Sequence, residues 1–248
     1  MTDKLHKTKG IVLRTVKYGE TSVIVLILTE KFGIQSYLVN GIRIATKKGS
    51  SKASLFQPTA ILDLVAYHNE LKHLQRLREF KWGYLYKSIF SNVKKNAVAL
   101  FMVELMTRCL KQPETHDELY HFAEDAFIHL DEASETVTAN FPLFFSLHLA
   151  VLLGFRMNDN YSIRKPVFDL REGNFVAEKT DHPNILEGRM AEVTSQLLKV
   201  MQPEELKEIK LNHDFRRNLL NSYETYYALH IQDFGELKSL PVLREILN

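Results

Sequence analysis

The chain has a single cysteine, Cys109, among its 248 residues. It can therefore form no disulfide within the chain, which suits a reducing cytoplasm. A thiolate zinc site, which needs about four soft ligands, is excluded as well. We expect the fold to be stabilised by the packing of apolar side chains, with Cys109 as a small buried one.

Long apolar runs are equally scarce. No run approaches the ~20 residues of a membrane span. The segment MTDKLHKTKG at residues 1–10 has no apolar stretch like that of a signal peptide. We expect a cytoplasmic protein with no membrane partner.

Motifs of nucleotide-driven or hydrolytic enzymes are missing too. Gly49 is followed by Ser50-Ser51-Lys52, so the order GxxxxGK[ST] is absent, and neither G-x-S-x-G nor H-E-x-x-H occurs. The histidines between residues 116 and 129 do not share one helix face and are typical of a solvated helix. The sequence predicts no catalytic site, no cofactor and no bound metal.

Charge is divided unevenly along the chain. Residues 1–81 hold fourteen Lys and Arg against six Asp and Glu, a net charge of +8. Because the whole chain has a net charge of +2, the remaining residues carry −6. A basic segment joined to an acidic one points to a polyanionic partner for the basic segment.

The basic segment has the pattern of short β-strands. The runs IVLRTV, SVIVLILT and IQSYLV are separated by turns at residues 18–20 and 31–33. Two further apolar runs, AILDLVAY and ELKHLQRLREF, follow with a turn at residues 68–70. Five strands at this spacing predict a small Greek-key barrel.

From Lys81 onward, apolar residues recur at helical spacing. We expect helical residues at 82–90, 98–109, 117–130, 144–154, 185–201, 214–231 and 242–247. Between them, PVFDLREGNFVAE at residues 166–178 predicts a β-hairpin. The expected class is α+β: a Greek-key barrel domain at residues 1–80, then an all-helical domain at 81–248 with a hairpin insertion at about 160–182.

The expected barrel carries side chains suited to nucleic acid. Barrels of this kind hold single strands by cations on phosphates and by aromatic rings on bases, the latter worth on the order of 1–3 kcal/mol per base. Each ring has an alternative place in the barrel core. The DNA-binding candidates are Arg14, Lys17, Arg43, Lys47, Lys48 and Lys52 for phosphates, and Tyr18 and Tyr37 for bases.

Four motifs follow one another in the basic segment: G-I-V-L-R-T-x-x-Y-G-E-T-S at residues 10–22, L-T-E-K-F-G at 28–33, V-x-G-I-R at 39–43 and L-F-Q-P at 55–58. In order and spacing they resemble the N-terminal domain of the bacterial RecO family of recombination mediators. The segment YYALHIQDFGELKSLPVLREIL at residues 226–247 is similar to the end of that family. The likeness covers most of the chain.

The resemblance implies an OB-fold domain that binds single- and double-stranded DNA, a helical domain, and no enzymatic activity. It also implies a place at the nucleoid, strand annealing, and, with the partner RecR, loading of RecA onto DNA coated with single-stranded-DNA-binding protein. The acidic, Phe-ended tail of that coating protein needs a cation and an apolar slot. The candidates for tail binding are Arg108, Lys111, Arg216 and Arg217.

The chain departs from many relatives, which hold a four-cysteine zinc site after the central helices. Here the hairpin at residues 166–178 stands in that place, and we expect its packing to replace the metal. Two alternatives stay open: a helical interaction adaptor whose barrel binds RNA or protein, and an enzyme with an unrecognised site. Salt dependence separates a nucleic-acid partner from a protein partner, because phosphate binding releases counterions.

Overall fold

The structure is a computed structural model that describes residues 4–42 and 52–247. The chain divides into two compact units. The first takes in the chain as far as Lys87 together with Leu110–Ile128, and the second takes in Ser88–Cys109 and the chain from His129 onward. The chain therefore leaves the first unit, returns to it once and leaves it again.

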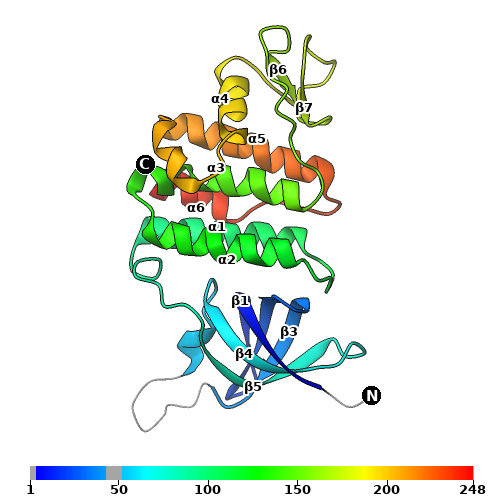
Figure 1. Cartoon of the computed structure of the whole chain (residues 1–248), viewed down its shortest axis with the longest axis vertical. Coiled ribbons are helices and arrows are strands. Elements are labelled where there is room, and N and C mark those ends of the chain that lie inside the picture. Colours follow the sequence, from blue (N-terminus) through cyan, green and yellow to red (C-terminus); the bar gives the residue numbers. More distant parts are fainter. Residues whose placement is uncertain (1–3, 43–51, 248) are drawn as a thin grey trace. The chain divides into compact units, whose positions relative to one another are not determined.

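The first unit contains a closed five-stranded barrel (Figure 1). Its strands are β1 (Lys4–Tyr18), β2 (Ser22–Thr29), β3 (Gly33–Val39), β4 (Ile61–His68) and β5 (Leu74–Trp82), with the 3-10 helix η1 (Lys52–Phe56) before β4. The strand order is β1-β2-β3-β5-β4, and neighbours are antiparallel except for β3 and β5. This is the five-stranded barrel of the OB-fold, so the predicted barrel is confirmed.

Strand β1 pairs along both of its edges. Its residues 4–11 pair with β4 and its residues 10–18 pair with β2. Gly10 lies where the two pairings overlap, and a Cβ atom there would come within 2.5 Å of the Ile27 side chain. Glycine therefore lets the sheet fold over itself at this point.

A bulge in β1 reverses the faces of its side chains. Val12 pairs with the buried Ile27 and lies in the barrel core, whereas Arg14 pairs with Leu26 after a register shift and is exposed. Strict alternation would put residues 12 and 14 on the same face. The extra residue of the bulge sends Arg14 outward instead.

Apolar side chains from the strands fill the barrel. Strand β2 alternates buried Val23, Val25 and Ile27 with half-exposed residues, as its β-branched run predicts. The core also contains Val12, Tyr37, Val39, Ile42, Phe56, Ala60, Leu62, Leu64 and Ala66.

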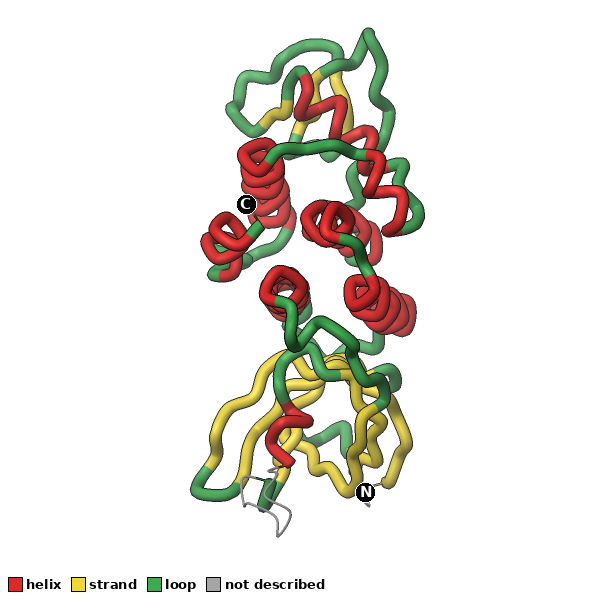
Figure 2. The backbone as a smooth tube through the Cα atoms, turned by 90° about the vertical axis from the view of Figure 1, so that its left-hand side faces the viewer, coloured by secondary structure: helices red, strands yellow, loops and turns green. Residues whose placement is uncertain are grey.

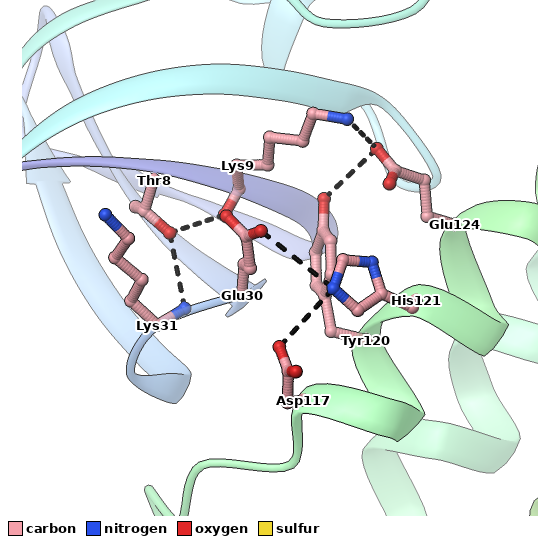
Figure 3. A network of polar contacts seen from close by, with 8 residues as sticks. All are labelled: Thr8, Lys9, Glu30, Lys31, Asp117, Tyr120, His121 and Glu124. Carbon is pink, nitrogen blue, oxygen red and sulfur yellow. Dashed lines mark hydrogen bonds and ion pairs between the residues drawn. The ribbon is translucent and has the colours of Figure 1, made fainter.

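Helix α2 (Asp117–Glu132) belongs to the barrel unit as far as Ile128. Figure 3 shows its side chains directed at the barrel: Lys9 Nζ lies 2.9 Å from Glu124 Oε1, and the Tyr120 hydroxyl donates to the same oxygen at 3.4 Å. The hydrogen bond to Glu124 raises the pKa of Lys9. A fragment that ends near Phe80, the boundary predicted from sequence, would leave Lys9 without this carboxylate.

The chain entering α2 also approaches the barrel closely. Gly33 has a φ of 59°, and a Cβ atom there would lie 1.8 Å from the carbonyl oxygen of Glu114. Nearby, His121 Nε2 lies 4.0 Å from Glu30 and 3.4 Å from Asp117 (Figure 3). The residue at position 33 must therefore be glycine for α2 to lie this close to the barrel.

The second unit is mainly helical (Figure 2). It contains α1 (Val93–Cys109), α3 (Glu135–Leu152), α4 (Arg189–Leu198), α5 (His213–His230), α6 (Ser239–Ile246) and the 3-10 helix η2 (Pro203–Glu208). The central helix is α3, which packs against α1, α4, α5 and η2. Among the residues described, α3 is the one helix long and apolar enough to cross a membrane, but 67% of it is buried inside the fold, as in a core helix.

The predicted helix over residues 82–90 is wrong. Trp82 ends β5, and the following residues form bends and turns. The backbone N–H groups of Ser88 and Ile89 each donate to the carboxylate of Asp131 at 2.8 Å. These bonds to a buried side chain replace the bonds that a helix would have made.

Other helix limits also differ from the prediction, among them the start of α1, which is Val93 in place of residue 98. Helix α3 begins at Glu135, where Ser134 caps it, and continues through Pro142 instead of starting after it. Ile185–Leu186 is a strand, β8, so α4 begins only at Arg189. Apolar periodicity located these helices but not their first residues.

The predicted hairpin is confirmed. Strands β6 (Val167–Asp169) and β7 (Asn174–Val176) pair antiparallel, and β8 adds an unpredicted third strand on the other edge of β6. Asp169, which is 2% exposed, accepts the backbone N–H of Arg171 at 2.8 Å and lies 3.4 Å from His182 Nε2. The replacement of zinc by packing stays a prediction; among the described residues no three potential metal ligands converge.

Two histidines and a phenylalanine meet on the barrel unit. The rings of Phe32 and His68 are stacked with centroids 3.9 Å apart, and His6 meets Phe32 edge-on at 5.2 Å. Burial and the nearby His6 lower the pKa of His68. The neutral form of His68 is therefore the one that the fold stabilises.

This lowered pKa predicts a loss of stability in acid. The contribution of His68 is complete above the unfolded-state pKa of ~6.5 and is lost as the pH falls below it. We expect the melting temperature to fall between about pH 7 and about pH 5, and to fall less in His68→Gln. Thermal melts across this range check it, with the exposed His73→Gln as a control that should keep the wild-type fall. An equal fall in all three proteins would contradict the assignment to His68.

Candidate nucleic-acid interface

One surface of the barrel combines cations, apolar side chains and a tyrosine. Residues directly opposite one another on neighbouring strands place their side chains on the same face. Across β1, β2, β3 and β5 the two central rows are Arg14, Leu26, Ser36 and Leu74, and then Val16, Ile24, Leu38 and Arg76. We call this surface, with Tyr18 at its end, the outer barrel face.

The exposed residues of this face are available for binding. Tyr18 is 54% exposed. The side chains of Arg14 and Arg76, and that of Lys17 at the end of β1, are exposed and form no ion pair or hydrogen bond within residues 4–42 and 52–247. Such cations can contact phosphates without first breaking an internal bond, and an exposed ring can stack on a base.

A cleft of about 500 Å³ adjoins the outer barrel face. It lies between the end of β3, η1 and β5, and its cations are Lys52, Arg76 and Arg78. The Phe80 ring forms part of the wall, with Lys52 Nζ 5.9 Å from its centre. Three cations beside an apolar wall are the elements of a groove that follows a phosphate backbone.

The predicted DNA-binding residues have different outcomes. Arg14 and Tyr18 lie on the outer barrel face, Lys17 lies between Val16 and Tyr18 at the end of β1, and Lys52 lines the cleft. Arg43, Lys47 and Lys48 fall outside the described residues. Contact of any of these residues with DNA stays a prediction.

The predicted stacking role of Tyr37 is wrong. The side chain is 0% exposed and belongs to the barrel core. Its hydroxyl lies near Thr29 without meeting hydrogen-bond geometry, and burial raises its pKa. Strand alternation in β3 directs Tyr37 inward, so no base can reach it while the barrel is closed.

Arg76 and Arg78 were missed as binding candidates. A signal was present in the sequence, because Leu74, Arg76 and Arg78 alternate along one strand. Side chains two residues apart on a strand share a face. The apolar residues of the same run obscured this alternation.

The helical unit holds a small apolar pocket with arginines around it. Leu143, Leu220, Leu240 and Leu243 form its apolar walls. Its cations are Arg216, Arg217 and Arg244, from α5 and α6. We call it the arginine pocket.

Arg244, which lines this pocket, is only partly hydrogen-bonded within the described residues. One terminal nitrogen donates to Asn221, whereas its Nε is buried and has no hydrogen-bond partner in the described part of the chain. A buried N–H without an acceptor costs about 1–3 kcal/mol.

The predicted pair Arg216 and Arg217 lies at this pocket. Arg216 donates to the carbonyl oxygens of Leu211 at 2.6 Å and Leu247 at 3.2 Å, which fixes its position. Burial lowers the pKa of Arg216. Arg217 is more exposed and lies 3.1 Å from Asp214.

The other two predicted tail-binding residues do not line the pocket. Arg108 donates to the carbonyl oxygen of Glu236 at 3.0 Å and lies 3.8 Å from Glu104. Lys111 belongs to the barrel unit. The structure therefore does not bring the four candidates together, and it adds Arg244, an isolated cation in a short helix that sequence analysis missed.

The barrel with its cationic outer face, followed by a helical unit, defines an OB-fold protein of the nucleic-acid-binding class. Residues 1–86 match the family model "Recombination protein O N terminal", and residues 91–241 match "Recombination protein O C terminal". The chain is 33% identical to "DNA repair protein RecO" of Christiangramia forsetii over 98% of this chain and 99% of the relative. For the same-named proteins of Bacteroides fragilis and Phocaeicola vulgatus the identities are 33% and 31%, over 98% of this chain and 100% of each relative.

The chain belongs to the RecO family. Its role is accordingly in DNA repair and recombination, and it is a DNA-binding protein.

The outer barrel face predicts a change in salt dependence. Replacing Arg14 and Arg76 with Ala should weaken oligonucleotide binding and flatten the log-affinity against log-salt slope by about 1.4 for single strands, at ~0.7 for each phosphate that is no longer neutralised. Fluorescence anisotropy over a salt series measures it. Lys207→Ala with Lys238→Ala, two exposed lysines of the helical unit, is the charge-matched control. An unchanged slope in the folded barrel variant would remove this face from the DNA site.

Proposed function

We propose that the chain is a non-enzymatic mediator that anneals complementary single strands and, together with RecR, helps to load RecA onto DNA coated with single-stranded-DNA-binding protein. The observation that carries the proposal is the outer barrel face, where exposed Tyr18 lies near cations that have no partner in the described residues. Base pairing supplies the free energy of annealing, about 1.4 kcal/mol per base-pair step. The protein needs only to hold strands, so no catalytic group is required.

The location follows from this partner. A protein whose exposed cations bind a polyanion collects where that polyanion is concentrated. In a bacterial cell this is the nucleoid, within the cytoplasm.

The arginine pocket is the proposed site for the acidic, Phe-ended tail of single-stranded-DNA-binding protein. In this proposal the phenyl ring packs against the apolar side chains of Leu220, Leu240 and Leu243, and the carboxylates pair with Arg217 and Arg244. The arginines beside these apolar walls support this assignment, because an acidic tail that ends in Phe needs cations next to an apolar slot. Arg216 holds the end of α6 in place through its bond to Leu247.

A second candidate function is an interaction adaptor whose barrel binds RNA or protein. It is favoured by the apolar part of the outer barrel face, where Val16 is 49% exposed and Leu74 is 39% exposed. An apolar protein interface releases few counterions, whereas a phosphate backbone releases about one for each phosphate neutralised. A steep salt dependence with DNA excludes the protein partner, and competition by RNA of the same sequence measures the preference between the nucleic acids.

Annealing of complementary oligonucleotides tests the proposed function. We expect the chain to accelerate duplex formation without nucleotide, both with naked strands and with strands coated by single-stranded-DNA-binding protein. The Arg14→Ala, Arg76→Ala variant should lose acceleration in both cases. Stopped-flow quenching of end-labelled strands provides the rate. If the wild-type chain binds DNA but leaves the annealing rate unchanged, the mediator assignment fails while DNA binding stands.

The arginine pocket predicts a separation of binding from stability. Arg244→Met removes a buried N–H without an acceptor but also the hydrogen bond to Asn221, and because these two effects on stability oppose one another the melting temperature should change little. The same change removes a charge-assisted hydrogen bond to the tail, worth about 1.5–3 kcal/mol, so affinity for an acidic peptide that ends in Phe should fall roughly tenfold or more. Anisotropy with the labelled peptide measures the affinity. Arg108→Ala, outside the pocket, should bind as the wild type does, and equal affinities in all three proteins would refute the site.

A further inference from the structure

A sharp turn before β6 carries an exposed isoleucine. Ser162 and Lys165 form an isolated β-bridge, with Lys165 N donating to Ser162 O at 2.9 Å. This leaves Ile163 and Arg164 at the apex, and Ile163 is 95% exposed. Burying one such side chain stabilises by about 1.5–3 kcal/mol, so its exposure leaves that gain unused in the free protein. We call residues 161–165 the insertion tip.

The insertion tip is held firmly at its base. The Asn160 side chain accepts the backbone N–H of Phe175 at 2.7 Å and donates to the Phe175 carbonyl at 3.0 Å, as a neighbouring strand would. The Tyr161 ring meets the Phe175 ring edge-on at 5.3 Å, and Asn158 N donates to Gly173 O at 2.8 Å. In Figure 2 the short strands of this sheet are flanked by long loops. The tip is thus presented by a fixed support, which lowers the entropy lost on binding.

Two cations beside Ile163 are free to bind. Arg164 and Lys165 are exposed, and neither side chain forms an ion pair or hydrogen bond in the part of the chain that the structure describes. The acidic residue of the same loop is already engaged: Asp159 accepts the Ser195 hydroxyl at 2.7 Å and lies 3.4 Å from Lys199 Nζ. The tip therefore has a local positive charge on a segment of the chain that is acidic on average.

We propose that the insertion tip is a second nucleic-acid contact, in which Ile163 packs against the exposed face of a base or terminal base pair and Arg164 and Lys165 contact the flanking phosphates. An apolar side chain with adjacent Arg and Lys is the set that wedge-type nucleic-acid contacts use. Isoleucine is stiff at χ1, so little side-chain entropy opposes its insertion.

The size of the tip favours nucleic acid over a protein partner. A stable protein interface buries roughly 1,200–2,000 Å² and centres on well-packed anchors. The tip offers the exposed Ile163, the partly exposed ring of Tyr161 and two cations on a single turn, which is far less surface. A nucleic acid needs less, because phosphates add electrostatic affinity at each cation and a base offers a flat apolar face.

A second contact has a consequence for annealing. The outer barrel face and the insertion tip belong to different units, so one chain presents nucleic-acid contacts on both. Annealing brings two strands together and creates a junction between paired and unpaired bases. Ile163 would act as a wedge at that junction. Only this role of Ile163 rests on the proposed annealing function.

The test uses the full chain and a partial duplex with 2-aminopurine at the junction. Ile163→Ser should abolish most of the fluorescence change that the wild type causes. It should weaken the affinity measured by anisotropy by less than about tenfold, because the cost of unstacking the junction offsets most of the gain from burying Ile163. Met201→Ser, which replaces another exposed apolar residue of the same unit, should behave as the wild type. Both positions are exposed, so the variants should melt with the wild-type protein.

The charges of the insertion tip are tested separately. Arg164→Gln with Lys165→Gln should flatten the salt slope for duplex binding by about 1.8, at ~0.9 for each phosphate, and Lys207→Gln with Lys238→Gln should not. If both tip variants keep the wild-type fluorescence change and salt slope, the tip is not a nucleic-acid contact. If the tip variants keep both properties but bind RecR or single-stranded-DNA-binding protein more weakly, the proposal is overturned in favour of a protein partner. Failure of the proposed function would look different, as loss of annealing or DNA binding in the wild type itself.

Discussion

The bulge in β1 is the local constraint on which the outer barrel face depends. Before the bulge, Val12 points into the barrel, and after it Thr15 pairs with the buried Val25 while Arg14 and Val16 point outward. Without that shift, Arg14 and Tyr18 would lie on the same side of the strand as Val12 and would face the core. A charge placed there would lose hydration without a partner, at a cost of several kcal/mol. The bulge thus sets which cations reach solvent.

The cations of the barrel unit fall into two groups. Lys9 is paired with Glu124 of α2, and Lys81 lies 3.4 Å from Asp63. Arg14, Lys17 and Arg76 have no such partner in the described residues. Acidic residues therefore neutralise the barrel where it meets its own helix and leave the outer barrel face positive. The net charge of +8 over residues 1–81 is less informative than this distribution.

Sequence patterns predicted the features that depend on residues close to one another along the chain. Strand β2 coincides with the predicted run, and the hairpin lies where its turn residues indicated. Tyr18 and Tyr37 are the same residue type, but alternation along β3 directs the Tyr37 ring into the barrel. The residue type alone does not reveal this difference. The segment after Trp82 has helical spacing and still forms turns, because its N–H groups bond to Asp131, more than forty residues away. The orphan Nε of Arg244 is likewise a property of packing among α3, α5 and α6 and has no local signal.

The two candidate sites would bind negative charge in physically different ways. On the outer barrel face the cations are solvated and unpaired, so each phosphate contact is weak, salt-sensitive and independent of sequence, which suits strands that must slide and exchange. In the arginine pocket the guanidinium of Arg216 is fixed by carbonyl oxygens and that of Arg244 is partly desolvated. Donors that are fixed and desolvated lose little entropy on binding, and they favour one orientation of a bound carboxylate. One chain could therefore bind a nucleic acid weakly and a peptide end selectively. The weak binding would depend on cations that are solvated, and the selective binding on cations that the fold fixes in place.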